Sequence, residues 1–202
     1  ENTLVICTSV SGNTQETLSI LEQVKKKSLK SISFSSNGKM EKYCLQNNLE
    51  HRFVKENHSP RVSFASFLYK MLKVLGPMLP ITESDIIDSI ENLNHVRKEI
   101  SVENLTEYNP SLNLSEWIKG IPVIYYPSGL NAVAIRFRNS LQENAKTHAI
   151  IEDVIETSHN GIVAWENDSN IQPILLRGQE DSIKTKERYD IFKEYFEKNG
   201  ID

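Results

Sequence analysis

The chain has 202 residues, of which 39% are hydrophobic and 25% are charged, as in a globular protein with a sizeable core. Its formal net charge of -4 argues against the broad basic surface that non-specific nucleic-acid binding requires. The sequence has no apolar run of the roughly 18 residues that a membrane span needs, and it has no secretory signal. We therefore expect neither nucleic acid nor a membrane as a partner.

The two cysteines, Cys7 and Cys44, are too few for a disulfide framework. We expect them to be reduced thiols, and this favours a cytoplasmic location. The sequence begins at Glu1 almost directly inside a predicted strand and ends just after a predicted helix. We therefore expect a chain that is truncated at both ends.

Predicted strands and helices alternate in the first part of the chain. A buried strand at 3–8 leads into a helix that begins near Thr14, where apolar residues recur at helical spacing. Alternation at this interval favours parallel strand pairing and an α/β fold. The next elements are a strand at 31–34, a loop at 35–38, a helix at 39–48 and a strand at 51–54.

Two amphipathic helices follow, and we interpret their apolar stripes as core packing. The polar residues 100–112 lack a clear period and contain Asn109-Pro110, so they are the predicted boundary between two halves. The first stripe consists of Phe64, Phe67, Leu68, Met71, Leu72 and Leu75, and the second of Ile86, Ile87, Ile90 and Leu93.

The α/β pattern restarts after this boundary. We therefore expect two halves, 1–110 and 111–202, each with a parallel sheet flanked by helices. The elements of the second half are a strand at 121–127, a helix at 129–147, a strand at 171–176 and a charged helix at 182–198.

A hydroxyl-rich turn joins the first strand to the first helix. The N-terminus of a helix has unpaired N–H groups and a partial positive charge, so it favours anions. Gly12 permits close approach of a ligand, and Ser9, Ser11, Asn13 and Thr14 offer neutral hydrogen-bonding groups. These residues predict a phosphate site.

Two features of this turn limit the choice of phosphate ligand. It lacks the lysine of a Walker A loop and the three glycines of a dinucleotide fingerprint, which disfavours ATP and NAD. A simpler alternative is that Asn13 or Thr14 only caps the helix.

The run from Ser9 to Thr17 resembles the first signature of the sugar isomerase (SIS) family, Ser-x-Ser-Gly-Asn-Thr-x-Glu-Thr, at every position. In that family the hydroxyls hold the phosphate of a phosphosugar. Further segments resemble the branch of bifunctional phosphoglucose/phosphomannose isomerases. They are SSNGKM at 35–40, SPRVSF at 59–64, RFRNSLQENAK at 136–146 and ETSHNGIVAWE at 156–166.

The resemblance implies an isomerase that interconverts glucose 6-phosphate and fructose 6-phosphate, and mannose 6-phosphate as well. Arg61 would stabilise charge during isomerisation, Glu143 would be the general base, and His159 would open the sugar ring. The histidine would reach the active site of the neighbouring subunit in a homodimer. The residues implied to bind the phosphosugar are Ser9, Ser11, Gly12, Asn13, Thr14, Ser35 and Gly38, with Ser36, Asn160 and Trp165 nearby.

Each catalytic candidate also has a plainer interpretation. Glu143 lies seven residues from Arg136, so both would lie on a solvated face of one helix. Arg61 could form a surface ion pair, and His159 could be structural. The histidines outside the motifs, which we interpret as surface or structural residues, are His51, His58, His95 and His148.

The sequence also departs from the family pattern. It reads IETSHN around His159, where the family has PELNHN, and the differences fall at Ile155, Thr157 and Ser158. No cluster of His, Cys and carboxylates has ligand spacing, so we expect neither a metal nor a cofactor. The alternative function is a non-catalytic phosphosugar-binding SIS module or regulator.

Overall fold

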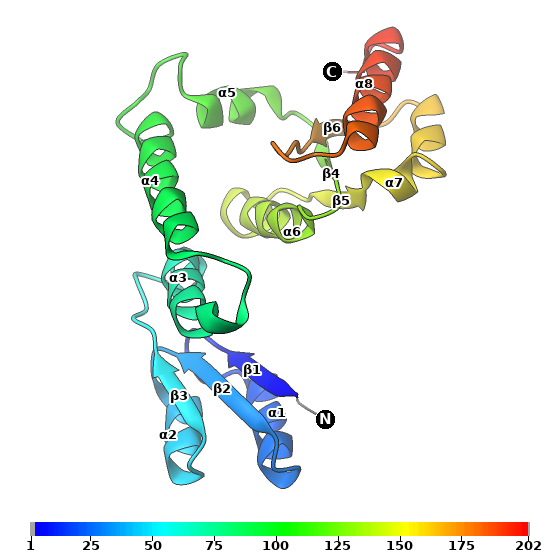
Figure 1. Cartoon of the computed structure of the whole chain (residues 1–202). Coiled ribbons are helices and arrows are strands. Elements are labelled where there is room, and N and C mark those ends of the chain that lie inside the picture. The colour runs from blue at the N-terminus through cyan, green and yellow to red at the C-terminus, as the bar shows by residue number, and fades with distance from the viewer. Residues whose placement is uncertain (1–2, 202) are drawn as a thin grey trace. The chain divides into compact units, whose positions relative to one another are not determined.

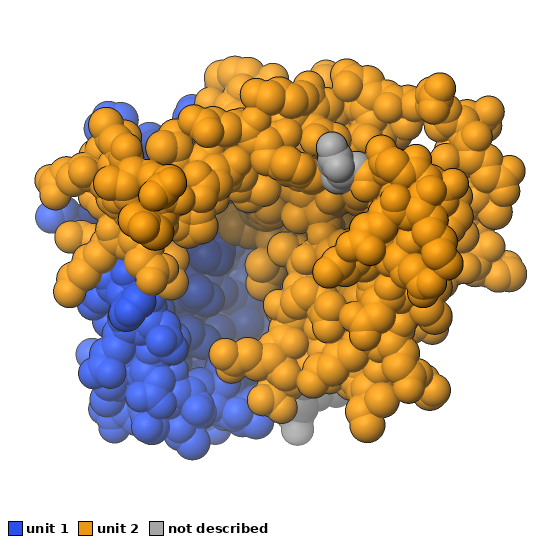
Figure 2. All heavy atoms as spheres, turned by 90° about the horizontal axis from the view of Figure 1, so that it is seen from above, with its two compact units in different colours: residues 1–95 blue, residues 96–202 orange. Residues whose placement is uncertain are grey.

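The computed structural model describes residues 3–201. The chain forms two compact units, residues 1–95 (unit 1) and 96–202 (unit 2), coloured separately in Figure 2. The sequence-based boundary at residue 110 stays a prediction. Among the described residues, no helix is both long enough and apolar enough to cross a membrane.

Unit 1 contains a parallel sheet in the order β1-β2-β3 (Figure 1), as the alternating pattern predicts. The register places Cys7 opposite Ser33 and Ser33 opposite His51. The carboxyl ends of all three strands therefore lie along one edge of the sheet. The strands are β1 (Leu4–Thr8), β2 (Lys30–Ser35) and β3 (Glu50–Phe53).

Helices cover both faces of this sheet. On one face, α1 (Gln15–Lys26) and α2 (Gly38–Gln46) pack with Cys7 in a core that also contains Cys44. Both cysteines are free and buried, and burial raises the pKa of each thiol. On the other face, α3 (Phe64–Leu75) packs against β2.

The structure corrects two expectations about burial in unit 1. The first strand was predicted to be buried, but Leu4 and Ile6 are 37% and 44% exposed, because β1 is an edge strand among the described residues and α3 packs against β2. On α3, Phe67 and Leu75 are buried as predicted, whereas Phe64 and Leu68 are exposed.

The next helix also differs from its prediction. Helix α4 (Glu83–Glu99) forms where expected, but the prediction that its apolar stripe packs in the core is wrong. No residue of α4 is buried, and Ile87, Ile90 and Leu93 are exposed. Apolar periodicity shows which face of a helix is hydrophobic, and it does not show that another element covers this face.

Unit 2 contains a second parallel sheet, in the order β5-β4-β6. The central strand β4 (Ile121–Tyr126) forms where a strand is predicted and is largely buried, and Ile124 pairs with both Ile151 and Ile174. The other elements are α5 (Pro110–Trp117), α6 (Asn131–Ser140), β5 (Ile150–Asp153), α7 (Val154–Thr157), β6 (Ile171–Leu175) and α8 (Ile183–Lys198).

The core of unit 2 lies on both faces of β4. Helix α8 buries Tyr189, Phe192 and Phe196 against Val123 and Tyr125. The ring centroids of Tyr125 and Phe192 are 5.7 Å apart in an edge-to-face arrangement. On the opposite face, α6 contributes Ala134 to a core with Ile124 and Ala149.

The elements of unit 2 that were not predicted include β5, α5 and α7. Strand β5 pairs with β4, although its four residues include the charged pair Glu152 and Asp153. Helix α5 begins within the predicted boundary segment, because the buried side chain of Asn109 accepts hydrogen bonds from the N–H groups of Ser111 and Leu112.

Candidate functional site

The hydroxyl-rich turn and the second loop both follow carboxyl ends of neighbouring strands. Residues 9–14 connect β1 to α1, and residues 35–38 include the end of β2 and the start of α2. Parallel pairing of β1 with β2 places these loops side by side at one edge of the sheet. Open α/β sheets bind ligands at this edge.

The 9–14 loop is organised around the hydroxyl of Ser9. Ser9 is only 7% exposed, and its Oγ lies 2.7 Å from Thr14 Oγ1. The same Ser9 oxygen accepts a hydrogen bond from the N–H of Gly12 at 3.1 Å. Ser11 Oγ accepts from the N–H of Asn13 at 3.2 Å. These bonds fold the loop tightly in front of α1.

No side chain in the described part of the chain caps the N-terminus of α1. Thr14 occupies the N-cap position, but its hydroxyl contacts Ser9 and caps no N–H group of the helix. The alternative that Asn13 or Thr14 acts only as a helix cap is therefore wrong. A helix N-terminus of this kind keeps its positive end available to an anion.

The 35–38 loop holds a buried network of polar groups. Ser35 is completely buried, and its hydroxyl donates to the carbonyl oxygen of Asn37 at 2.9 Å. The imidazole Nε2 of His51, on β3, lies 2.8 Å from the same Ser35 oxygen. Ser36 is 4% exposed, and its hydroxyl has no hydrogen-bond partner in the described part of the chain.

Two glycines allow the loops to interlock. A Cβ atom on Gly12, which has a φ of +65°, would lie 1.8 Å from the carbonyl oxygen of Asn37. A Cβ atom on Gly38, which has a φ of +86°, would lie 2.4 Å from the carbonyl oxygen of Ser11. Only glycine fits either position without moving the neighbouring backbone.

Hydrogen bonds from α2 complete the contact between the loops. The N–H of Met40 donates to the Gly12 carbonyl at 2.8 Å, and the N–H of Lys39 donates to Asn13 Oδ1 at 3.2 Å. The structure thus brings together all seven candidate phosphosugar-binding residues.

Arg61 also belongs to unit 1, on the short 3₁₀ helix η1 (Pro60–Val62). The loop around η1 is fixed by the buried Ser63, whose Oγ accepts from the N–H of Asn57 at 3.0 Å and donates to the Ser59 carbonyl at 2.9 Å. The arginine side chain is exposed. Hydrogen bonds of Ser63 thus hold the turn that carries Arg61.

Glu143 lies in unit 2 on the π-helical turn η3 (Leu141–Ala145), directly after α6. The predicted continuous helix over 129–147 is wrong in this segment. Lys146 then takes a left-handed conformation and donates from Nζ to the Glu143 carbonyl at 2.6 Å. The expectation that Glu143 and Arg136 share a face of this helical segment stays a prediction. Single π turns occur frequently at functional sites.

His159 lies in unit 2, just after the short helix α7, which itself follows directly from the end of β5. Asp153 caps α7 by accepting from the N–H of Ile155 at 2.8 Å, and the N–H of His159 donates to the Glu156 carbonyl at 3.0 Å. Asn160 donates to the Glu156 carboxylate at 2.9 Å. The imidazole is exposed at the end of this turn. Glu143 and His159 thus lie on separate elements of unit 2.

Trp165 belongs to the 3₁₀ helix η4 (Gly161–Glu166), and its indole N–H donates to the Tyr125 hydroxyl at 2.9 Å. Burial raises the pKa of Tyr125 to about 12. The hydrogen bond from Trp165 opposes this increase, and the charge of Glu152 adds to it.

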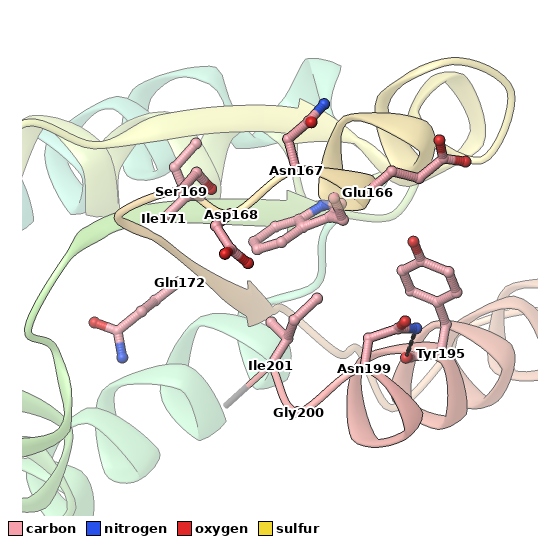
Figure 3. A pocket seen from close by; sticks show the side chains of 11 residues that line it. Glu166, Asn167, Asp168, Ser169, Ile171, Gln172, Tyr195, Asn199, Gly200 and Ile201 are labelled. Atoms are coloured by element: carbon pink, nitrogen blue, oxygen red, sulfur yellow. Dashed lines mark hydrogen bonds between the residues drawn. The ribbon is translucent and has the colours of Figure 1, made fainter.

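Trp165 also lines a cavity of about 610 Å³ near the amino end of β6 (Figure 3). The other lining residues in that cavity include Asp168, Gln172 and Asn199, and none of the catalytic candidates is among them.

Sequence reasoning missed His51, which it treated as surface or structural. The side chain contacts Ser35 although the two residues are sixteen positions apart. The signal for this contact is the register of β2 with β3, which places His51 opposite Ser33, on the same face of the sheet as Ser35. Such a register cannot be read from the two short strands alone.

Comparison with known proteins reveals sequences that are similar to this chain. Residues 107–202 match the family model described as the bacterial phospho-glucose isomerase C-terminal SIS domain. The bifunctional phosphoglucose/phosphomannose isomerase of Aquifex aeolicus is 30% identical over 98% of this chain and 60% of its own length. That of Caldicellulosiruptor bescii is 32% identical over 95% of this chain and 59% of its own length.

The fold agrees with a solved structure as well. Glucosamine-6-phosphate deaminase from Thermotoga maritima superposes with a TM-score of 0.67 at 13% identity, over 96% of this chain and 59% of that chain. The present chain spans about 60% of the length of its curated relatives. Residues 107–202 thus match a SIS-domain family, and the chain as a whole is similar to the bifunctional phosphoglucose/phosphomannose isomerases.

Proposed function

We propose that the chain is part of an isomerase that interconverts glucose 6-phosphate and fructose 6-phosphate, and mannose 6-phosphate as well. The proposal is supported by the names of two curated relatives and by the interlocked loops of unit 1. The observation that carries it is the uncapped N-terminus of α1, in front of which the buried Ser9 hydroxyl meets that of Thr14.

In this proposal the phosphate of the sugar binds at the start of α1. The hydroxyls of Ser11 and Thr14 and the amide of Asn13 are exposed and donate to phosphate oxygens, while Ser9 and Gly12 fix the shape of the loop. Hydrogen bonds to a charged acceptor contribute about 1.5–3 kcal/mol each. A few such bonds and the helix dipole hold the phosphate without a lysine.

The chemistry follows an enediolate route. The imidazole of His159 donates a proton to the ring oxygen while the anomeric hydroxyl loses its proton to water, so that the bond between C1 and the ring oxygen breaks and the sugar opens. The carboxylate of Glu143 then removes a proton from C2 of the aldose. The conjugate acid of Glu143 returns that proton to C1, while the hydroxyl proton moves between O1 and O2. Arg61 stabilises the negative charge of the enediolate. A positioned base contributes about 10²–10⁴-fold to the rate.

The assembly and location are parts of the same proposal. We infer a homodimer in which His159 completes the site of the neighbouring copy. We also infer a cytoplasmic location, which is supported by the two free, buried thiols of Cys7 and Cys44.

The test is to incubate the chain with fructose 6-phosphate and to follow glucose 6-phosphate and mannose 6-phosphate by NMR. A version extended at both ends, if the gene encodes one, is assayed beside it. Turnover in either supports the isomerase. Binding of fructose 6-phosphate without turnover in both would favour the non-catalytic phosphosugar-binding module, and absence of binding would overturn both functions.

A further inference from the structure

The link between His51 and Ser35 extends the site beyond the loop residues. The two side chains lie on one face of the sheet, because His51 pairs with Ser33 and side chains two positions apart in a strand share a face. The imidazole is partly buried at this position, and Glu41 of α2 is close enough to influence its pKa. His51 therefore belongs to the wall behind the 35–38 loop.

The hydrogen bonds define which group donates. The Ser35 hydroxyl has one proton, and it donates this proton to the Asn37 carbonyl at 2.9 Å, since a carbonyl can only accept. The contact of 2.8 Å between Ser35 Oγ and His51 Nε2 then requires the imidazole to donate its Nε2 proton. A directed chain of hydrogen bonds runs from His51 through Ser35 to the Asn37 carbonyl.

This carbonyl is the point where the two loops meet. It occupies the space that a side chain on Gly12 would fill, and the following residues Lys39 and Met40 donate to Asn13 and Gly12. The peptide of Asn37 thus supports the backbone that forms the phosphate loop. Loss of the hydrogen bond from Ser35 would remove this support from the carbonyl and free the loop to move.

We propose that His51 is a positioning residue, which holds the 35–38 loop against the phosphate loop through Ser35 and thereby sets the affinity for the phosphosugar. This inference rests on the proposed function, because it assumes that the 9–14 loop binds phosphate. It adds a residue that lies in no family motif and touches the ligand only through other groups.

The test compares His51→Leu with His51→Gln. Glutamine places an amide N–H near the position of imidazole Nε2 and keeps the donor, whereas leucine removes it. Isothermal titration with fructose 6-phosphate should show about tenfold weaker binding for His51→Leu, the size expected for one hydrogen bond. His51→Gln should bind within about twofold of the native chain. Exposed His148 supplies the control, and His148→Leu should bind normally.

Two further measurements keep the inference testable. Ser35→Ala should weaken binding about as much as His51→Leu, and the double variant should weaken it no further, since both changes break one chain of bonds. Normal binding by His51→Leu, or equal losses in the Leu and Gln variants, would overturn the role. If the native chain binds no fructose 6-phosphate, the proposed function fails. Nitrogen NMR of His51 then tests the link by itself, because the link requires a proton on Nε2.

Discussion

The Cα atom of Gly12 faces the carbonyl oxygen of Asn37 so closely that a Cβ atom would lie 1.8 Å from that oxygen. The two residues belong to loops that follow neighbouring strands, β1 and β2. The contact therefore joins the loop after β1 to the loop after β2. Because it is made by backbone atoms, rotation of a side chain could not relieve the overlap that a Cβ atom on Gly12 would cause. Both loops must keep their shape together.

Substitution of Gly12 by Ala should therefore damage both folding and binding. We expect Gly12→Ala to lower the free energy of unfolding by about 3 kcal/mol or more, from backbone overlap and the positive φ together, and to abolish measurable fructose 6-phosphate binding. Urea unfolding and isothermal titration give these quantities. Gly200 has the same φ of +65° with no atom within 4 Å, so Gly200→Ala should cost only about 1–2 kcal/mol and leave binding intact. Equal effects of the two substitutions would show that the loop contact is unimportant.

Thr14 allows the phosphate role to be separated from helix capping. Its hydroxyl contacts Ser9 and caps no helix N–H, so Thr14→Val should weaken fructose 6-phosphate binding about 10–100-fold, through loss of a bond to a charged acceptor. The matched control is Ser182, whose hydroxyl caps α8 by accepting from the N–H of Thr185. Ser182→Ala should lower the free energy of unfolding by about 0.5–2 kcal/mol with unchanged binding. A Thr14→Val variant that loses stability and keeps its affinity would point to capping instead.

Glu143 is the residue on which the choice between an isomerase and a binding module depends. Glu143→Gln keeps the size of the side chain and removes its basicity, so we expect kcat to fall about 10²–10⁴-fold while the affinity for fructose 6-phosphate stays within about twofold. NMR assays of isomerisation and isothermal titration supply the two values. Glu194→Gln, on the exposed surface of α8, should change neither. Unchanged turnover in Glu143→Gln would remove Glu143 from the mechanism.

Much of the fold could be predicted because its signals are local. The apolar spacing of Leu18, Leu21 and Val24 predicts α1, and the short segments SISF and IPVIYYP predict β2 and β4. The phosphate loop could be predicted because its residues are consecutive. The four-residue strand β5 has no comparable signal, since half of its residues are charged and Asp153 also caps the next helix.

Features that depend on distant residues could not be predicted. The exposure of Ile87 and Leu93 on α4 depends on which elements pack against that helix, which its own periodicity does not contain. The π turn at Glu143 follows an ordinary helical sequence. The His51–Ser35 contact depends on the register of β2 with β3. The sequence of each strand alone does not show which residues of the two strands lie opposite each other.

The titration of His51 gives a last prediction, on stability. Burial lowers the pKa of its imidazole, and Glu41 opposes part of this shift. In the unfolded chain the imidazole takes up a proton near pH 6.5, whereas in the folded chain it stays neutral to lower pH. The unfolded state then binds more protons, so the contribution of His51 to stability is present above about pH 6.5 and is lost as the pH falls toward the folded pKa.

Glutamine does not titrate, and His51→Gln should therefore lose less free energy of unfolding than the native chain between about pH 7.5 and about pH 5.5. Urea unfolding at the two pH values measures the difference. Equal losses in the native chain and His51→Gln would mean that the imidazole is as easily protonated in the folded state as in the unfolded one.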